Sequence, residues 1–397
     1  MNKNRQPASI DAVSARLLTH RKNGKLFYAL GDSIIRKSGR DLDFLKYEEA
    51  ANYFYKSSLA YKACGRWQEA GDSLMRGAWC YERLKSGEIA AAIFCEAAET
   101  FMKTDMSNAI DAYQAASKHY QDANPKNPLI AGNLEKKIAM IHFWDSAYDD
   151  AAVHFARAAE LLEGEVNRNQ NDFCLEREAE CYVLMGRSLE EASRIYESIA
   201  EASVKSNLRR FNARDFLLRA VLCLVGDPMK DVRAEYDDED DAVAVYDEIQ
   251  ELSEEKYNAI EWKVHEYEVT DFLWKCSKEA LFLKNILRAR LSWDLETFAN
   301  HVYYWDNVRT LDKYCLSLLN VMRMEIQNEL EFRDKKAIRD EKRKAKKILF
   351  DEKFKEKKAA MAILGVDIVE KDVEDEVNKE IMDMRGRSDS VDDDSVS

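Results

Sequence analysis

The chain has 397 residues, with 60 Lys and Arg against 74 Asp and Glu, and therefore a formal net charge of −14. Its 13 glycines and 4 prolines supply little turn chemistry, which excludes an all-β sandwich, a collagen-like repeat and a Pro-rich linker protein. An apolar fraction of 46% excludes wholesale disorder. A chain of this length forms two or three globular domains or one elongated repeat array.

The first 45 residues are predicted to form a helix and a basic, aromatic loop. Their polar start lacks the apolar segment of a targeting signal, and no apolar stretch of the chain reaches bilayer-spanning length. The basic stretch 20–40 contains Lys25, Leu26, Phe27, Tyr28 and Leu30. Aromatic and aliphatic side chains beside cations suit the boundary of an anionic membrane. In the alternative, Phe27 and Tyr28 pack against the first repeat.

Residues 46–255 repeat a short phrase in which an aromatic residue follows two small ones. Further small and apolar residues lie three and seven positions after each aromatic, which places them on one stripe of an α-helix. The aromatic positions of the phrase are Phe54, Phe94, Tyr113, Phe155, Tyr196 and Tyr246. A period of about 40 residues holds a pair of helices. We therefore predict an all-α, tetratricopeptide-like solenoid of antiparallel helix hairpins.

After the repeats the composition changes three times. The Trp-rich segment 256–332 is predicted to form a C-terminal helical bundle, and 333–365 a basic helical extension. The last segment, 366–397, is acidic and is predicted to be disordered. The basic helix has two interpretations, a solvated single helix supported by charge pairs or a surface for acidic lipid or nucleic acid. The first is preferred, so no nucleic acid partner is expected.

Catalytic motifs are missing from the sequence. It contains no phosphate-binding loop, dinucleotide-binding glycine motif, nucleophile elbow or HExxH. The six histidines do not cluster with cysteines or carboxylates at metal-ligand spacing, and the eight cysteines form no CxxC. The cysteines are interpreted as small buried residues in a reducing compartment. We expect a cytoplasmic binding protein that is not an enzyme and holds no cofactor and no metal.

The segment 206–226 carries arginines at roughly helical spacing, namely Arg209, Arg210, Arg214 and Arg219. Such a cationic ridge could hold an acidic partner helix through bidentate pairs with carboxylates. The alternative is a solvated helix face with an internal Asp215–Arg219 pair.

The order and spacing of these phrases over residues 10–332 resemble the soluble NSF attachment proteins, the SNAP family, and most closely its alpha/beta branch. The segments NARDFLLRAVLCL and RTLDKYCLSLLNVMRMEI also resemble family segments. The resemblance implies a twisted sheet of helix hairpins and a C-terminal bundle. It also implies an adaptor in vesicle trafficking that binds assembled SNARE four-helix bundles at the cytosolic face of membranes. Several copies, each a monomer when free, would recruit the AAA+ ATPase NSF for SNARE disassembly.

The resemblance also suggests roles for particular residues. The family's membrane-touching loop corresponds to Leu26, Phe27, Tyr28 and Leu30, beside Lys25. The basic SNARE-facing position corresponds to Arg214, and Arg210 and Arg219 lie near it. Two other basic positions align with Asn133 and Phe173, where Lys137 and Arg177 are expected to substitute. The NSF-binding terminus corresponds to Glu329, Leu330, Glu331 and Phe332.

The chain departs from the family pattern at two places that concern NSF. An acidic patch of the family falls at Arg288, Leu291 and Ser292, so its charge is lost. A further 65 residues follow Phe332. A second hypothesis is therefore a divergent α-solenoid scaffold that binds other helical or peptide partners without NSF coupling.

Overall fold

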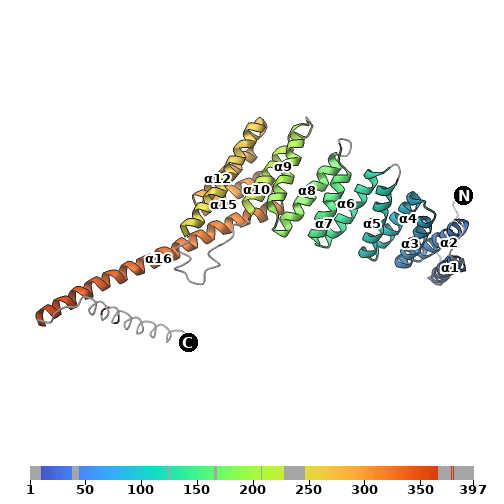
Figure 1. Ribbon diagram of the computed structural model, residues 1–397, viewed down its shortest axis with the longest axis horizontal. Helices are drawn as coiled ribbons and strands as arrows, with labels where there is room; N and C mark the ends of the chain where they lie inside the picture. The colour runs from blue at the N-terminus through green and yellow to red at the C-terminus, as the bar shows by residue number, and fades with distance from the viewer. Residues whose placement is uncertain are drawn as a thin grey trace. The chain divides into compact units, whose positions relative to one another are not determined.

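The computed structural model describes residues 10–37, 44–123, 126–164, 168–206, 208–227 and 246–364, together with residues 377 and 379 (Figure 1). The regular elements of these residues are all helices, which confirms the all-α prediction. The predicted disordered tail lies almost entirely outside the described residues. The helices in chain order are α1 (Ile10–Lys37), α2 (Phe44–Ala63), α3 (Trp67–Arg83), α4 (Gly87–Phe101), α5 (Met106–Asp122), α6 (Pro128–Trp144), α7 (Tyr148–Leu161), α8 (Arg168–Met185), α9 (Leu189–Val204), α10 (Ala213–Gly226), α12 (Tyr246–Thr270), α13 (Phe272–Lys275), α14 (Lys278–Leu291), α15 (Leu295–Val308) and α16 (Lys313–Leu364).

The chain divides into two compact units. Unit 1 comprises Met1–Met229, Lys256–Leu287 and His301–Val321, and unit 2 comprises Lys230–Glu255, Arg288–Asn300 and Met322–Ser397. In unit 1, each helix from α1 to α10 packs against the next along the chain (Figure 1). This succession is the predicted solenoid of helix hairpins. The segment predicted as a C-terminal bundle contributes helices to both units, and the predicted basic extension continues α16 without a break.

The repeated aromatic residues form the core of the hairpin stack. Phe54 and Phe155 have no exposed surface, and Phe94, Tyr113 and Tyr196 are buried as well. Fully buried alanines flank them on the same helix stripes. The small residues let neighbouring helices approach closely, and the rings fill the space between them.

Charge pairs link helices that are two positions apart in the chain. Lys62 on α2 donates to Glu96 on α4 at 2.6 Å, and Lys137 on α6 reaches Glu99 on α4 at 3.3 Å. Arg219 on α10 pairs with a glutamate of α8. The even-numbered helices of the stack therefore lie side by side in one layer, as a stack of hairpins requires.

The predicted basic, aromatic loop is a helix instead. Helix α1 runs without interruption through Gly24 and Gly31. A Cβ atom on Gly24 would lie 2.9 Å from the ring of Tyr61, and one on Gly31 would lie 3.1 Å from the ring of Phe54. The two glycines are therefore points of close approach between α1 and α2, not hinges of a loop.

Candidate partner-binding surfaces

The predicted membrane-binding residues divide between two environments on α1. Tyr28 packs edge-on against Phe54 with ring centroids 5.2 Å apart, and Phe27 stacks on Tyr53 at 6.5 Å. Both rings are partly buried against α2, as the alternative interpretation expected. In contrast, Leu26 is 55% exposed and Leu30 is 37% exposed.

Lys25 is exposed beside these two leucines. Helix α1 thus presents one cation and two leucines to solvent, while its aromatic rings pack inward. A surface suited to membrane contact remains, and it is smaller than the predicted loop.

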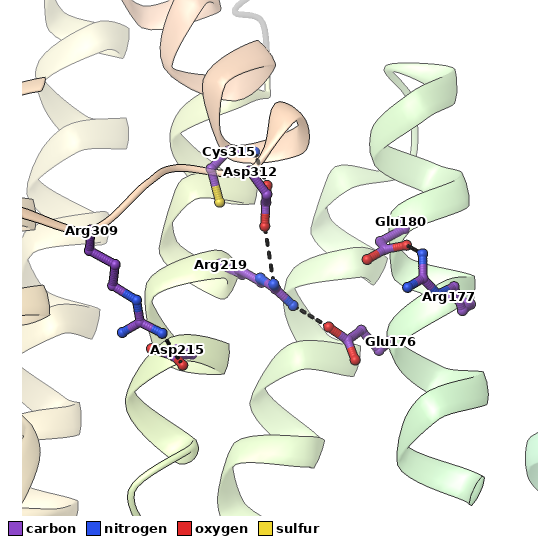
Figure 2. Close-up of polar contacts among 8 residues, drawn as sticks. All are labelled: Glu176, Arg177, Glu180, Asp215, Arg219, Arg309, Asp312 and Cys315. Carbon is purple, nitrogen blue, oxygen red and sulfur yellow. Dashed lines mark hydrogen bonds and ion pairs between the residues drawn. The ribbon is translucent and has the colours of Figure 1, made fainter. Parts of the chain in front are cut away.

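Arg219 is held inside the protein between two carboxylates. Its guanidinium donates to Glu176 of α8 and, at 3.0 Å, to Asp312, which directly precedes α16 (Figure 2). The side chain is 25% exposed. Although burial acts to lower the pKa of Arg219, the nearby Tyr196, Glu176 and Asp312 raise it overall. Arg219 is therefore a structural cation whose charge is already neutralised.

The helix-internal pair proposed as the alternative for Arg219 is also wrong. Asp215 pairs with Arg309, which follows α15 (Figure 2). Arg309 also donates to Glu279 at 3.0 Å. Asp215 and Arg219 therefore pair with residues outside α10 and not with each other.

Arg177 and Arg210 are likewise paired within the chain. Arg177 donates to Glu180 one turn further along α8 (Figure 2). Burial raises the pKa of Glu180 to about 7, against the opposing effect of Arg177. Arg210 donates at 3.0 Å to Asp271, whose side chain is 1% exposed. The predicted cationic ridge is thus largely neutralised, since neighbouring carboxylates come from helices distant in sequence.

Two predicted SNARE-binding residues retain an available charge. No carboxylate of the described residues pairs with Arg214, whose guanidinium lies 5.6 Å from the ring centroid of Phe211. Lys137 reaches Glu99 at 3.3 Å, and both side chains are largely exposed, at 48% and 63%. Exposed pairs of this kind contribute about 0–1 kcal/mol and exchange readily for another partner. Arg214 and Lys137 are the predicted cations best placed to meet an acidic surface.

The predicted NSF-binding residues lie inside α16 in unit 2. Glu329 is 1% exposed and accepts a hydrogen bond at 2.8 Å from Nε of Arg333. Glu331 is exposed, whereas Leu330 and Phe332 are partly buried. Glu329, which is predicted to contact NSF, is thus buried in a helix that continues past it to Leu364.

The buried polar groups of α5 to α8 were not singled out by the sequence as functional. Glu135 accepts hydrogen bonds from Ser117 at 2.7 Å and lies 2.8 Å from Nδ1 of His154. Although burial raises the pKa of Glu135, these two partners hold it below its ordinary value. Among the described residues, Glu178 accepts a side-chain hydrogen bond from the Tyr182 hydroxyl, at 3.4 Å. Burial raises the pKa of Glu178 to about 7. The first network joins α5, α6 and α7, and the Glu178–Tyr182 bond lies within α8.

Most histidines and cysteines that the structure describes pack among other side chains of the chain. His154 is a satisfied core residue, and His119 stacks on Phe94 with ring centroids 5.7 Å apart. All eight cysteines are free; most are buried, but Cys276 is exposed, contrary to the prediction. Within the described ranges there is no cluster of three His, Cys, Asp or Glu that could hold a metal ion. No helix described there is both long and apolar enough to cross a membrane.

An all-helical stack of hairpins with charged and apolar surface patches defines a protein-binding repeat scaffold. The family described as soluble NSF attachment protein, SNAP, matches residues 43–251 and 245–327. The chain therefore belongs to the SNAP family.

Individual relatives match over most of their length. The chain is 23% identical to the alpha-soluble NSF attachment protein of Homo sapiens over 287 residues, which cover 72% of this chain and 87% of that protein. It is 24% identical to the beta-soluble NSF attachment protein of Bos taurus, covering 72% and 85% of the two chains. The alpha-soluble NSF attachment protein of Saccharomyces cerevisiae is 24% identical, covering 72% and 89%. The resemblance inferred from the residues is confirmed.

Proposed function

We propose that this chain is an adaptor that binds assembled SNARE complexes at membranes and recruits the ATPase NSF to disassemble them during vesicle trafficking. The observation that carries the proposal is the family match, which spans both the hairpin stack and the helices that follow it. In this proposal the chain is not an enzyme, because NSF supplies the work of ATP hydrolysis. The free chain is a cytoplasmic monomer without nucleic acid, and several copies surround one SNARE bundle.

The contact with SNAREs is proposed to involve Arg214 and Lys137. SNARE bundles are acidic on the outside, so cations at the edge of a contact steer and orient them. Arg177, Arg210 and Arg219 are assigned to holding the scaffold together instead, because each is already paired with a carboxylate of this chain.

The contact with the membrane is proposed to involve Lys25, Leu26 and Leu30 on α1. Exposed leucines enter the headgroup region, and the adjacent cation is attracted to anionic lipid. Phe27 and Tyr28 support this surface from behind through their packing on α2.

The contact with NSF is proposed to involve Leu330, Glu331 and Phe332 on α16. Glu329 has a different role, since its side chain is buried in unit 2 and pairs with Arg333 one turn further along the same helix. Replacing Arg333 is therefore expected to disturb α16 as well as any contact with NSF.

A capture experiment tests the adaptor proposal. Assembled soluble SNARE complexes are immobilised, and the chain and NSF are added with a non-hydrolysable ATP analogue. The expected result is retention of NSF only when the chain is present. Failure of the chain to bind the SNARE complexes at low ionic strength would contradict the proposal.

The divergent scaffold remains the second candidate. It is favoured by the internally paired arginines and by the burial of Glu329. In that case the chain would bind a helix or peptide of another assembly, and NSF would not be retained in the capture experiment even where SNARE complexes are bound.

A further inference from the structure

A basic hollow lies in unit 1 where the first described residues of α8 meet the C-terminal end of α9 and the segment that follows it. Its cavity volume is about 620 Å³. The polar side chains around it and one leucine at its edge are Arg168, Asn169, Lys205, Ser206, Arg209 and Leu208. Its lining contains three cations and no carboxylate, in a protein whose net charge is −14.

Two of the three cations in the hollow are available to a ligand. Arg209 pairs with Asp172 on α8. Burial raises the pKa of Asp172, and the charges of Arg209 and Arg168 act against this rise. Neither Arg168 nor Lys205 forms an ion pair with any carboxylate in the described parts of the chain. Lys205 also borders a second pocket, of about 360 Å³, whose lining includes the four acids Glu197, Glu201, Glu266 and Asp271.

Arg168 and Asn169 bring a guanidinium and a side-chain amide to the hollow from the first described residues of α8. A guanidinium binds phosphate oxygens through two parallel hydrogen bonds. The hollow therefore suits a phosphate group.

Two large apolar side chains project beside the hollow. Leu208 is 94% exposed and Phe211 is 62% exposed, both on the segment that joins α9 to α10. A site for a soluble anion does not require exposed apolar side chains, whereas such side chains next to cations fit the interface of a membrane. The guanidinium of Arg214, on the first turn of α10, lies 5.6 Å from the ring centroid of Phe211.

We propose that this hollow binds headgroup phosphates of an anionic membrane, with Leu208 and Phe211 inserted into the interface. It is a second membrane contact, separate from the surface of α1. Because successive helices of the stack are antiparallel, the turns that follow odd-numbered helices lie at one end of it. The C-terminal end of α1 and the hollow are therefore at the same end of the stack in unit 1.

Vesicle binding of the full chain tests this proposal. The probe is phosphatidylcholine vesicles with and without phosphatidylserine, separated from free protein by flotation. The double variant Arg168→Ala, Lys205→Ala is expected to bind the anionic vesicles about tenfold more weakly than the unmodified chain. The variant Leu208→Ser, Phe211→Ser is expected to lose about fivefold, because its apolar side chains no longer enter the interface.

A matched control removes two cations at the opposite end of the hairpins, Lys103→Ala and Arg187→Ala. This control changes the net charge equally and is expected to bind the anionic vesicles within about twofold of the unmodified chain. Equal vesicle binding by the Arg168, Lys205 variant and this control would overturn the proposal. A variant that loses binding of inorganic phosphate while keeping vesicle binding would also overturn it, since the hollow would then be a site for a soluble anion.

The result can be separated from the adaptor proposal and from the α1 surface. Capture by SNARE complexes without vesicles is expected to be unchanged in the Arg168, Lys205 variant. Loss of vesicle binding in Leu26→Ser, Leu30→Ser together with retention in the Arg168, Lys205 variant would assign membrane contact to α1 alone and overturn the second contact.

Discussion

Unit 1 contains two groups of cations that look alike in the sequence and differ in the structure. Arg219 lies between Glu176 and Asp312 and serves the packing of helices. Arg168 and Lys205 border an open hollow without a carboxylate in its lining. The availability of a cation to a partner is therefore decided by which acids the fold brings to it, and not by its spacing along a helix.

Replacing Arg219 is the strongest way to test this difference. The variant Arg219→Met is expected to lower the free energy of unfolding by about 2–4 kcal/mol, because Glu176 and Asp312 would remain partly buried without their cation. Urea unfolding followed by circular dichroism measures the change. The control Arg168→Met is expected to stay within about 0.5 kcal/mol of the unmodified chain. Equal stability of the two variants would show that Arg219 is not a structural cation.

The buried carboxylate Glu178 provides the opposite test, because it has no cation beside it. Its pKa is about 7 in the folded chain, against 4.5 for the ordinary group. The folded state therefore binds the proton more tightly, so stability falls as pH rises from about 4.5 to 7. Glu178→Gln is expected to raise the free energy of unfolding by about 2–3 kcal/mol at high pH and by less than about 1 kcal/mol near pH 5.

Unfolding at a series of pH values checks the Glu178 prediction. The exposed glutamate Glu190 is a suitable control, since it lies on the surface of α9. If Glu178→Gln changes the free energy of unfolding by the same amount at every pH, Glu178 is not a buried carboxylate with a raised pKa.

The two faces of α1 are expected to respond differently to substitution. Tyr28→Ser removes a half-buried ring from Phe54 and is expected to destabilise the chain by about 2 kcal/mol. Leu26→Ser, Leu30→Ser is expected to leave stability within about 0.5 kcal/mol and to weaken vesicle binding severalfold. Thermal unfolding and vesicle flotation together separate these outcomes. Vesicle binding that depends on Tyr28 in a fully folded variant would instead place the ring in the membrane.

The smallest change is expected from the two cations proposed to contact SNAREs, the exposed Lys137 and the partly buried Arg214. Lys137→Gln, Arg214→Gln should leave stability nearly unchanged and weaken capture by SNARE complexes about fivefold, with a shallower dependence on salt. The capture experiment at several salt concentrations measures both quantities. Unchanged affinity and salt dependence would show that these cations do not face the SNARE bundle.

The hairpin stack was predictable because its determinants are local. The aromatic at Phe54 and the small residues around it repeat at helical spacing, and the same arrangement recurs near Phe94 and Phe155. Burial of these stripes requires hairpins stacked on one another, whatever the turns between them. The structure buries all three rings as the pattern demands.

The charge environment was not predictable, because it is made by residues far apart in sequence. Asp312 meets Arg219 across 93 positions, and Asp271 meets Arg210 across 61. Spacing within one helix carries no information about such partners. The loop predicted in the first 45 residues was wrong for a related reason. Gly24 and Gly31 lie where α1 contacts α2, and the sequence alone does not distinguish a glycine at a helix contact from a glycine at a loop hinge.

The burial of Glu329 could not be predicted from the sequence. The sequence predicts a helical extension after residue 332, and α16 continues to Leu364. Glu329 is nevertheless 1% exposed, which depends on the neighbours that unit 2 brings to this turn of α16. In a long helix without Gly or Pro, the sequence of the helix alone does not indicate which turn becomes buried.

Disassembly of a preassembled, fluorescently labelled SNARE complex by NSF and ATP decides whether this chain acts as an adaptor. The account predicts that disassembly begins when the folded chain is added and is lost when it is omitted. SNARE complexes that stay intact in the presence of NSF, ATP and the folded chain would contradict it.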